Sequence, residues 1–200
     1  MAERAIAPEE KRQRLLGAAV RVFAAKGYHA CRVGDIAEEA GVAYGLLYHY
    51  FPSKEAVLET IFRDTWTQML DRIREVETSG EPAGEQIRRV AALVLRTWKR
   101  DPDLVRVLVR EVTRSPQLQN EIDEIGLAFD ALERIIAAGQ EQGELRRDVD
   151  PRLGALIFYG AMEEMLTSWV LGGLPDGDEA VAHAEQAVVD VLCNGIATSG

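Results

Sequence analysis

One stretch of this 200-residue chain, residues 33–54, constrains the fold more than any other. Its first part repeats apolar residues at intervals of three and four, which is one face of a short helix. Gly41 follows, and glycine readily adopts the left-handed conformation that ends many helices. A second segment runs from residue 43 to residue 51 and stops at Pro52. The pattern therefore predicts two short helices joined by a tight turn.

The second of these helices has two chemically different faces. A period of 3.6 residues places Leu47 on an apolar, inward side. Tyr44, Gly45, Tyr48 and His49 fall on the other side, where there is no acidic group. Phenol and imidazole groups can donate to phosphate or base edges, and glycine allows close approach to a groove. This favours a helix-turn-helix that enters the DNA major groove; the alternative is a helical hairpin whose aromatic residues only pack on a neighbour.

Three motifs around this stretch resemble a known family. They are FAAKGY at residues 23–28, DIAEEAGV at residues 35–42 and LYHYFPSKE at residues 47–55. Together they resemble the N-terminal DNA-binding domain of the TetR family of transcriptional regulators, over roughly the first quarter of the chain. The resemblance implies a DNA-binding domain at residues 1–53 and a ligand-binding and dimerisation domain at residues 54–200.

The resemblance also implies which residues touch DNA. Tyr48 and His49 carry over as contacts, and Lys54 as a phosphate clamp, since an ammonium beside a helix N-terminus attracts anions. Arg32 departs from the family pattern, in which a hydroxyl caps the helix; it cannot accept that bond but could place a guanidinium against the DNA. Base readout is left to Arg32, Tyr44, His49 or apolar contacts with thymine methyls. The expected DNA contacts are Arg32, Ala43, Tyr44, Gly45, Leu46, Tyr48, His49 and Lys54.

Charge is divided unevenly along the chain. The net charge is −10, yet residues 1–54 hold eight Lys and Arg against six Asp and Glu. An acidic remainder repels DNA and so confines contact to the mildly basic end. The charge pattern is therefore compatible with a small DNA-binding domain attached to a larger, acidic C-terminal domain.

The rest of the chain is predicted to be helical, which makes the fold class all-α. Ser53 is the expected N-cap of a long helix that ends near Glu77. Asp or Ser followed by Pro marks three later helix starts. The expected helices span about 85–100, 102–114, 116–142, 151–171 and 179–197, and no segment has convincing strand-like alternation.

The last two helices are expected to form a homodimer. Both carry rows of small and apolar residues, which suit a two-fold four-helix interface. The alternative is that these rows complete the core of a monomer. A dimer is favoured because two DNA-binding domains match the two halves of a palindromic double-stranded operator. The family resemblance also implies a dimer. Because the chain has no apolar run of about 18 residues, no apolar signal core and only two isolated cysteines, we expect a cytoplasmic protein without a membrane partner.

The resemblance further implies a small-molecule pocket in the C-terminal domain, residues 54–200. Its candidate walls are aromatic residues, although such residues at helical spacing are chiefly core packing. Arg106, Arg110 and Arg114 recur every four residues, and this row suits the phosphates of a large anion; a solvated face with local ion pairs is the alternative. The candidate aromatic walls are Phe62, Trp66, Trp98, Phe129, Phe158, Tyr159 and Trp169.

The sequence AYGLLY at residues 43–48 looks most like TetR-type regulators of fatty-acid degradation that respond to long-chain acyl-CoA. We therefore expect a repressor that binds a palindromic operator as a dimer and is released by long-chain acyl-CoA. The alternative effector is a cationic aromatic compound, as for multidrug-type regulators, received by Glu163 and Glu164.

Nothing in the sequence indicates an enzyme. The three histidines fit no catalytic or metal-ligand spacing, and there is no Gly-rich phosphate loop. No cofactor or metal is expected. A helical adaptor that binds only proteins is the remaining class; it predicts no salt-sensitive DNA affinity, whereas a DNA-binding regulator predicts affinity that falls steeply with salt.

Overall fold

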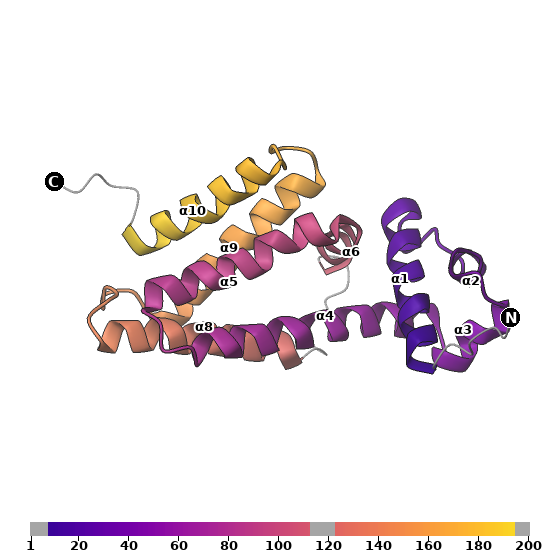
Figure 1. Cartoon of the computed structure of the whole chain (residues 1–200), viewed down its shortest axis with the longest axis horizontal. Coiled ribbons are helices and arrows are strands. Elements are labelled where there is room, and N and C mark those ends of the chain that lie inside the picture. Colours follow the sequence, from indigo (N-terminus) through magenta and orange to yellow (C-terminus); the bar gives the residue numbers. More distant parts are fainter. Residues whose placement is uncertain (1–7, 113–122, 195–200) are drawn as a thin grey trace, which may run out of the picture.

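The computed structural model describes residues 8–112 and 123–194, and within these ranges every regular element is a helix. The three N-terminal helices form a small unit at one end of an elongated molecule, and α4 runs from this unit into a larger bundle (Figure 1). The expected all-α fold is confirmed. The helices are α1 (Pro8–Lys26), α2 (Val33–Ala40), α3 (Tyr44–Tyr50), α4 (Lys54–Glu77), α5 (Ala83–Arg100), α6 (Pro102–Val112), α8 (Asp123–Glu141), α9 (Pro151–Val170) and α10 (Asp178–Asn194).

Local capping explains where several helices begin and end. Ser53, Asp101 and Asp150 each accept a hydrogen bond from the backbone N–H three residues further on, at 2.9–3.2 Å. Gly41 ends α2 with φ of 64°, a left-handed conformation that suits glycine. These predicted boundaries are confirmed. The predicted start at Ser115 lies outside the described residues, as does Arg114.

The described residues form two hydrophobic cores. The first joins α1, α2 and α3 to the first turns of α4, with Phe23, Ile36, Leu47 and Phe62 at most 2% exposed. Val107 of α6 also packs in this core. The hydrophobic core around the N-terminal helices therefore extends beyond residue 53, because α4 and α6 supply part of its wall.

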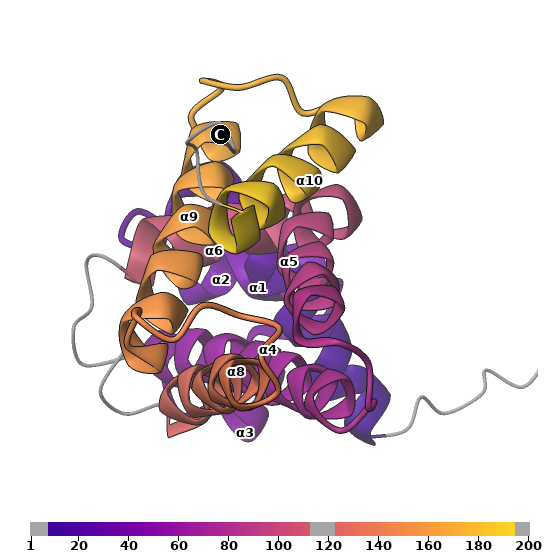
Figure 2. The same ribbon diagram turned by 90° about the vertical axis from the view of Figure 1, so that its left-hand side faces the viewer.

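The second core fills the bundle formed by the rest of α4 with α5, α8, α9 and α10. Figures 1 and 2 place α8 beside α4 on one side of this bundle, with α10 on the other side next to α5 and α9. No helix in the described ranges has the length and apolar character needed to cross a membrane.

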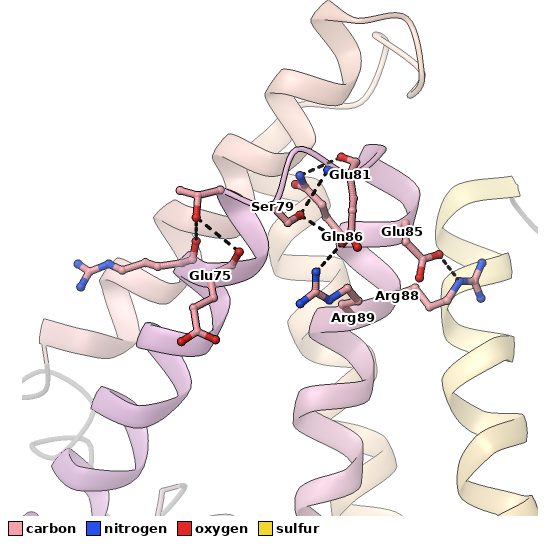
Figure 3. Close-up of polar contacts among 9 residues, drawn as sticks. Glu75, Ser79, Glu81, Glu85, Gln86, Arg88 and Arg89 are labelled. Carbon is pink, nitrogen blue, oxygen red and sulfur yellow. Dashed lines mark hydrogen bonds and ion pairs between the residues drawn. The ribbon is translucent and has the colours of Figure 1, made fainter.

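Polar contacts close the hairpin of α4 and α5 (Figure 3). The Glu81 carboxylate accepts hydrogen bonds from Arg89 Nη1 at 2.6 Å and from Ser79 Oγ at 3.2 Å. Gln86 Nε2 donates to the Glu81 carbonyl at 3.0 Å. The bond from Arg89 is the main reason that the pKa of Glu81 lies below its ordinary value. The turn thereby holds α5 beside α4, and both helices go on to border the cavity described below.

Candidate DNA-binding surface and effector cavity

Helix α3 presents an exposed aromatic surface. Tyr44 is 56% exposed and Tyr48 is 45% exposed, and their rings meet edge to face with centroids 5.5 Å apart. His49 is exposed beside them, and a side chain at Gly45 would meet no atom within 4 Å. Leu47 on the opposite face is fully buried. The helix is thus anchored by one face and offers the other to a groove.

The two tyrosine hydroxyls lie 3.4 Å apart, and either can donate to the other. This hydrogen bond is the main cause that raises the pKa of Tyr48 above its ordinary value. The phenol therefore stays protonated near neutral pH and remains a donor for phosphate or a base edge. Of the other expected contacts on this helix, Ala43 is exposed and Leu46 is half-buried.

Arg32 directly precedes α2, and its side chain makes no capping bond, as expected. The cap comes instead from Asp35, whose carboxylate accepts the Arg32 backbone N–H at 2.8 Å and Lys26 Nζ at 2.8 Å. These bonds hold the pKa of Asp35 below its ordinary value, with Lys26 the largest cause. Sequence reasoning missed Asp35, although an acidic residue three positions after a cap is half of a capping box. The Arg32 guanidinium is exposed and has no hydrogen-bond partner among the described residues.

Lys54 lies at the N-terminus of α4, but its ammonium points into the protein. Nζ donates to the backbone carbonyls of Tyr28 at 2.8 Å and Cys31 at 3.1 Å, and it lies 4.4 Å from the centroid of the Tyr28 ring. The Tyr28 hydroxyl donates to Glu55 at 3.1 Å. An ammonium has three N–H donors, so one remains for a phosphate. Lys54 therefore ties the loop between α1 and α2 to α4, a structural role that the sequence did not predict.

The larger bundle contains an apolar cavity of about 130 Å³ that is partly open, bordered by α4, α5, α6, α8 and α9. Trp66, Phe129, Phe158 and Tyr159 line it, as the sequence led us to expect. The rings of Phe129 and Tyr159 pack with centroids 4.7 Å apart. Its volume is close to that of an engineered cavity of about 150 Å³ that binds benzene, and below the roughly 300–1,000 Å³ of pockets for drug-sized ligands.

Three expected wall residues do not line this cavity. Phe62 is fully buried in the N-terminal core. Trp98 stacks on Trp169 with ring centroids 6.5 Å apart, and the Trp169 indole N–H donates to the carbonyl of Pro175 at 3.0 Å. Phe62, Trp98 and Trp169 thus lie outside this lining, because an apolar stripe identifies the buried face of a helix but not which neighbour that face meets.

Arg106 and Arg110, the two described members of the predicted arginine row, do not line the cavity either. Arg106 Nη1 donates to Asp103 at 2.6 Å, and its guanidinium lies 5.3 Å from the centroid of the Trp98 ring. Arg110 Nη1 instead donates to the carbonyl of Ala24 in α1 at 3.2 Å. The two side chains therefore contact different parts of the protein, and neither lines the cavity.

Two helices contact both the cavity and the N-terminal core. On α6, Val105, Leu108 and Val109 line the cavity, whereas Val107 packs in the N-terminal core. On α4, Thr65, Trp66, Met69 and Ile73 line the cavity, whereas the first turns belong to the N-terminal core. A ligand that moves the cavity walls must therefore act on the helices that support α1–α3.

Acidic residues border the cavity at one point. Of the predicted pair, Glu163 lines the cavity, whereas Glu164 is exposed and accepts a hydrogen bond from Ser168 Oγ at 3.3 Å. No group of three or more potential metal ligands gathers in the portion of the chain that the structure covers.

Comparison with known proteins gives the family. Residues 15–61 match the model for bacterial regulatory proteins of the tetR family, and residues 62–187 match the model for the C-terminal region of YsiA-like protein. The chain is 30% identical over 188 residues to the fatty acid metabolism regulator protein of Bacillus subtilis (strain 168), covering 93% of this chain and 95% of that protein.

Two similar solved structures are fatty-acid regulators. The FadR structure from Bacillus subtilis in complex with stearoyl-CoA is 29% identical, with a TM-score of 0.83 and coverage of 92% of this chain and 99% of that one. The fatty acid degradation regulator FadR from Bacillus halodurans is 28% identical, with a TM-score of 0.85 and coverage of 95% and 97%. These matches and the helix-turn-helix geometry agree, and this chain belongs to the TetR family of bacterial transcriptional regulators.

Proposed function

We propose that this repressor binds a palindromic operator as a homodimer in the cytoplasm and is released from DNA by a long-chain acyl-CoA. The observation that carries the proposal is an apolar cavity whose walls include α4 and α6, the helices that also pack in the N-terminal core. Each buried methylene of an acyl chain contributes about 0.8 kcal/mol, so a long chain favours such a site strongly.

The size of the cavity supports a mechanism. At about 130 Å³ it must widen to take a long chain, and widening moves α4 and α6 against α1. A ligand that prefers the widened form then disfavours the arrangement in which two α3 helices match successive turns of DNA. The bound stearoyl-CoA of the Bacillus subtilis FadR structure supports this effector class over the cationic compounds of multidrug-type regulators.

The test begins with a duplex selected by the purified protein from random double-stranded DNA. Palmitoyl-CoA is expected to raise the melting temperature of the protein and to release the labelled duplex, because a ligand of the native state stabilises it. CoA alone and a cationic aromatic dye are the controls. Release by the dye and not by palmitoyl-CoA would overturn the effector assignment in favour of the multidrug type.

Tyr48→Ala is expected to weaken operator binding by about 10- to 100-fold, since one good base contact contributes roughly 1–3 kcal/mol. The side chain is 45% exposed and packs mainly on Tyr44, so the melting temperature should stay close to that of the wild type. Fluorescence anisotropy with the selected duplex measures the loss, and Tyr48→Phe separates the hydroxyl from the ring. Equal affinities for wild type and Tyr48→Ala would remove this residue from the DNA-binding surface.

An exposed apolar stripe supports the proposed dimer. Leu153, Leu156 and Ile157 on α9 are 51%, 48% and 50% exposed, and Val191 on α10 is 47% exposed. Contiguous exposed apolar residues mark contact sites. Leu156→Asp is expected to convert a dimer to a monomer in sedimentation experiments and to weaken operator binding, because a charge would be buried unpaired. Leu127→Asp on α8, where the leucine is 42% exposed, is the matched control and should remain dimeric; a dimeric Leu156→Asp protein would exclude the stripe as the interface.

A further inference from the structure

We infer that Tyr159 and Glu163 form a polar recognition pair in the cavity, which accepts a neutral acyl thioester and rejects a free fatty acid. This inference rests on the proposed function, because it assigns residues that would select the effector. It depends on which polar groups of the lining are already occupied, on the spacing of the two residues, and on the difference in charge between a thioester and a carboxylate.

Two of the four oxygen-bearing side chains in the described lining already have partners. Thr65 Oγ1 donates to the carbonyl of Ile61 at 2.7 Å, and Thr97 Oγ1 donates to the carbonyl of Leu93 at 3.0 Å. Each of these hydroxyls is turned back onto its own helix. Tyr159 and Glu163 are the remaining oxygen-bearing side chains of the lining, and neither has a hydrogen-bond partner within residues 8–112 and 123–194. A polar group of the ligand would therefore find its partners at these two residues.

The two residues are correctly spaced to act together. They are four positions apart on α9, so they are neighbours on one helix face. The Tyr159 ring is held against Phe129. Burial and the nearby negative charge of Glu163 raise the pKa of Tyr159 to about 12. The phenol therefore keeps its proton at neutral pH and is a donor, while Glu163 is the one charged side chain among the described residues of the lining and an acceptor.

A CoA thioester matches this donor and acceptor. Its carbonyl oxygen can accept from the Tyr159 hydroxyl, and the first amide N–H beyond the sulfur can donate to Glu163. One helix turn, about 5.4 Å, separates residues stacked on a helix face, which is comparable to the reach of the two methylenes between sulfur and amide nitrogen. The acyl chain would then extend among the apolar walls that include Trp66 and Phe129.

A free fatty acid presents the opposite electrostatics. Its carboxylate would occupy the place of the thioester carbonyl, facing Glu163 across an apolar cavity where like charges are poorly screened. Specificity of this kind comes from repulsion of the wrong ligand as much as from attraction of the right one. The regulator would thus respond to the product of the reaction that joins a fatty acid to CoA, and not to its carboxylate substrate.

The test measures Kd values for palmitoyl-CoA and palmitate, each below the concentration at which it forms micelles, by isothermal titration. The wild type is expected to bind palmitoyl-CoA and to bind palmitate far more weakly. Glu163→Gln should tighten palmitate binding by at least about tenfold, because it removes one charge and keeps the shape. Tyr159→Phe should weaken palmitoyl-CoA binding by about three- to tenfold, the effect of one lost hydrogen bond.

Glu164→Gln is the matched control, since the same substitution on the exposed neighbour should leave both Kd values unchanged. Melting temperatures without ligand establish that each variant is folded. If palmitoyl-CoA binds the wild type but Glu163→Gln leaves palmitate affinity unchanged, this inference is overturned and the proposed function stands. If the wild type fails to bind palmitoyl-CoA, the proposed effector falls, and this inference falls with it.

Discussion

Replacing Lys54 with methionine is expected to lower both the stability of the protein and its affinity for the operator. The ammonium donates two charged hydrogen bonds, to the carbonyls of Tyr28 and Cys31, and contacts the Tyr28 ring. Hydrogen bonds to charged groups contribute about 1.5–3 kcal/mol when they are shielded, and this side chain is half-buried. A net loss of roughly 2 kcal/mol would reduce the melting temperature by about 4–8 °C.

The effect of this substitution on DNA binding has two sources. The loop that Lys54 holds leads directly into Arg32 and α2, so losing its anchor loosens the support of α3. The remaining N–H donor at the N-terminus of α4 is also lost to phosphate. We expect operator affinity to fall by about 100-fold at moderate salt, as for the loss of one good contact together with its positioning.

Lys26→Met is the matched control for Lys54→Met. Lys26 pairs with Asp35 at 2.8 Å, but its side chain is 55% exposed, and such surface pairs contribute at most about 1 kcal/mol. Thermal denaturation and anisotropy titrations on both variants separate the two roles of Lys54. A normal melting temperature with weakened DNA binding would leave only the phosphate role, and normal values for both measurements would remove both roles.

The second large effect is expected at Gly139 on α8. A Cβ atom there would lie 2.4 Å from the Cβ of Ala83 at the start of α5 and 2.9 Å from Cδ1 of Leu145. The Cβ of Ala83 is attached to the backbone and cannot rotate away. The backbone N–H of Ala83 also donates a hydrogen bond to the Glu144 carboxylate at 2.6 Å, which fixes its position. The two helices must separate, and overpacking of this kind typically costs about 1–3 kcal/mol. Gly139→Ala should therefore destabilise the protein, although alanine is the better helix former.

Gly126 offers the matched control on the same helix. A Cβ atom at Gly126 would meet nothing within 4 Å, so Gly126→Ala should stabilise the protein by about 0.5–1 kcal/mol. Urea denaturation at one fixed protein concentration compares the two variants, since the stability of the proposed dimer would depend on concentration. Opposite signs of the two changes are the expected result. A stabilised Gly139→Ala protein would contradict the close approach of α5 and α8.

Features that act within one or two helix turns were predictable from the sequence. Ser53, Asp101 and Asp150 cap their helices through groups three residues away, and Gly41 ends α2 through its own backbone freedom. The two faces of α3 follow from its 3.6-residue period. The three N-terminal motifs were enough to indicate the TetR family, which the comparisons confirm.

Features that depend on contacts between distant residues were not predictable. Lys54 binds carbonyls 23 and 26 positions earlier, and Arg110 binds a carbonyl in α1, 86 positions earlier. The aromatic stripes predicted residues that are buried or half-buried, but they could not distinguish Trp66, which lines the cavity, from Phe62, which packs in the N-terminal core.

The same limit applies to the acidic pair on α9. Successive residues of a helix point about 100° apart, so the rotation of α9 against α8 and α5 determines that Glu163 borders the cavity and Glu164 faces outward. The sequence by itself determined the helices, their starts and the exposed aromatic face of α3, because these depend on local backbone chemistry. Only the tertiary structure decided which side chains surround the cavity and that the Lys54 ammonium holds the loop between α1 and α2, because those positions depend on how separate helices pack.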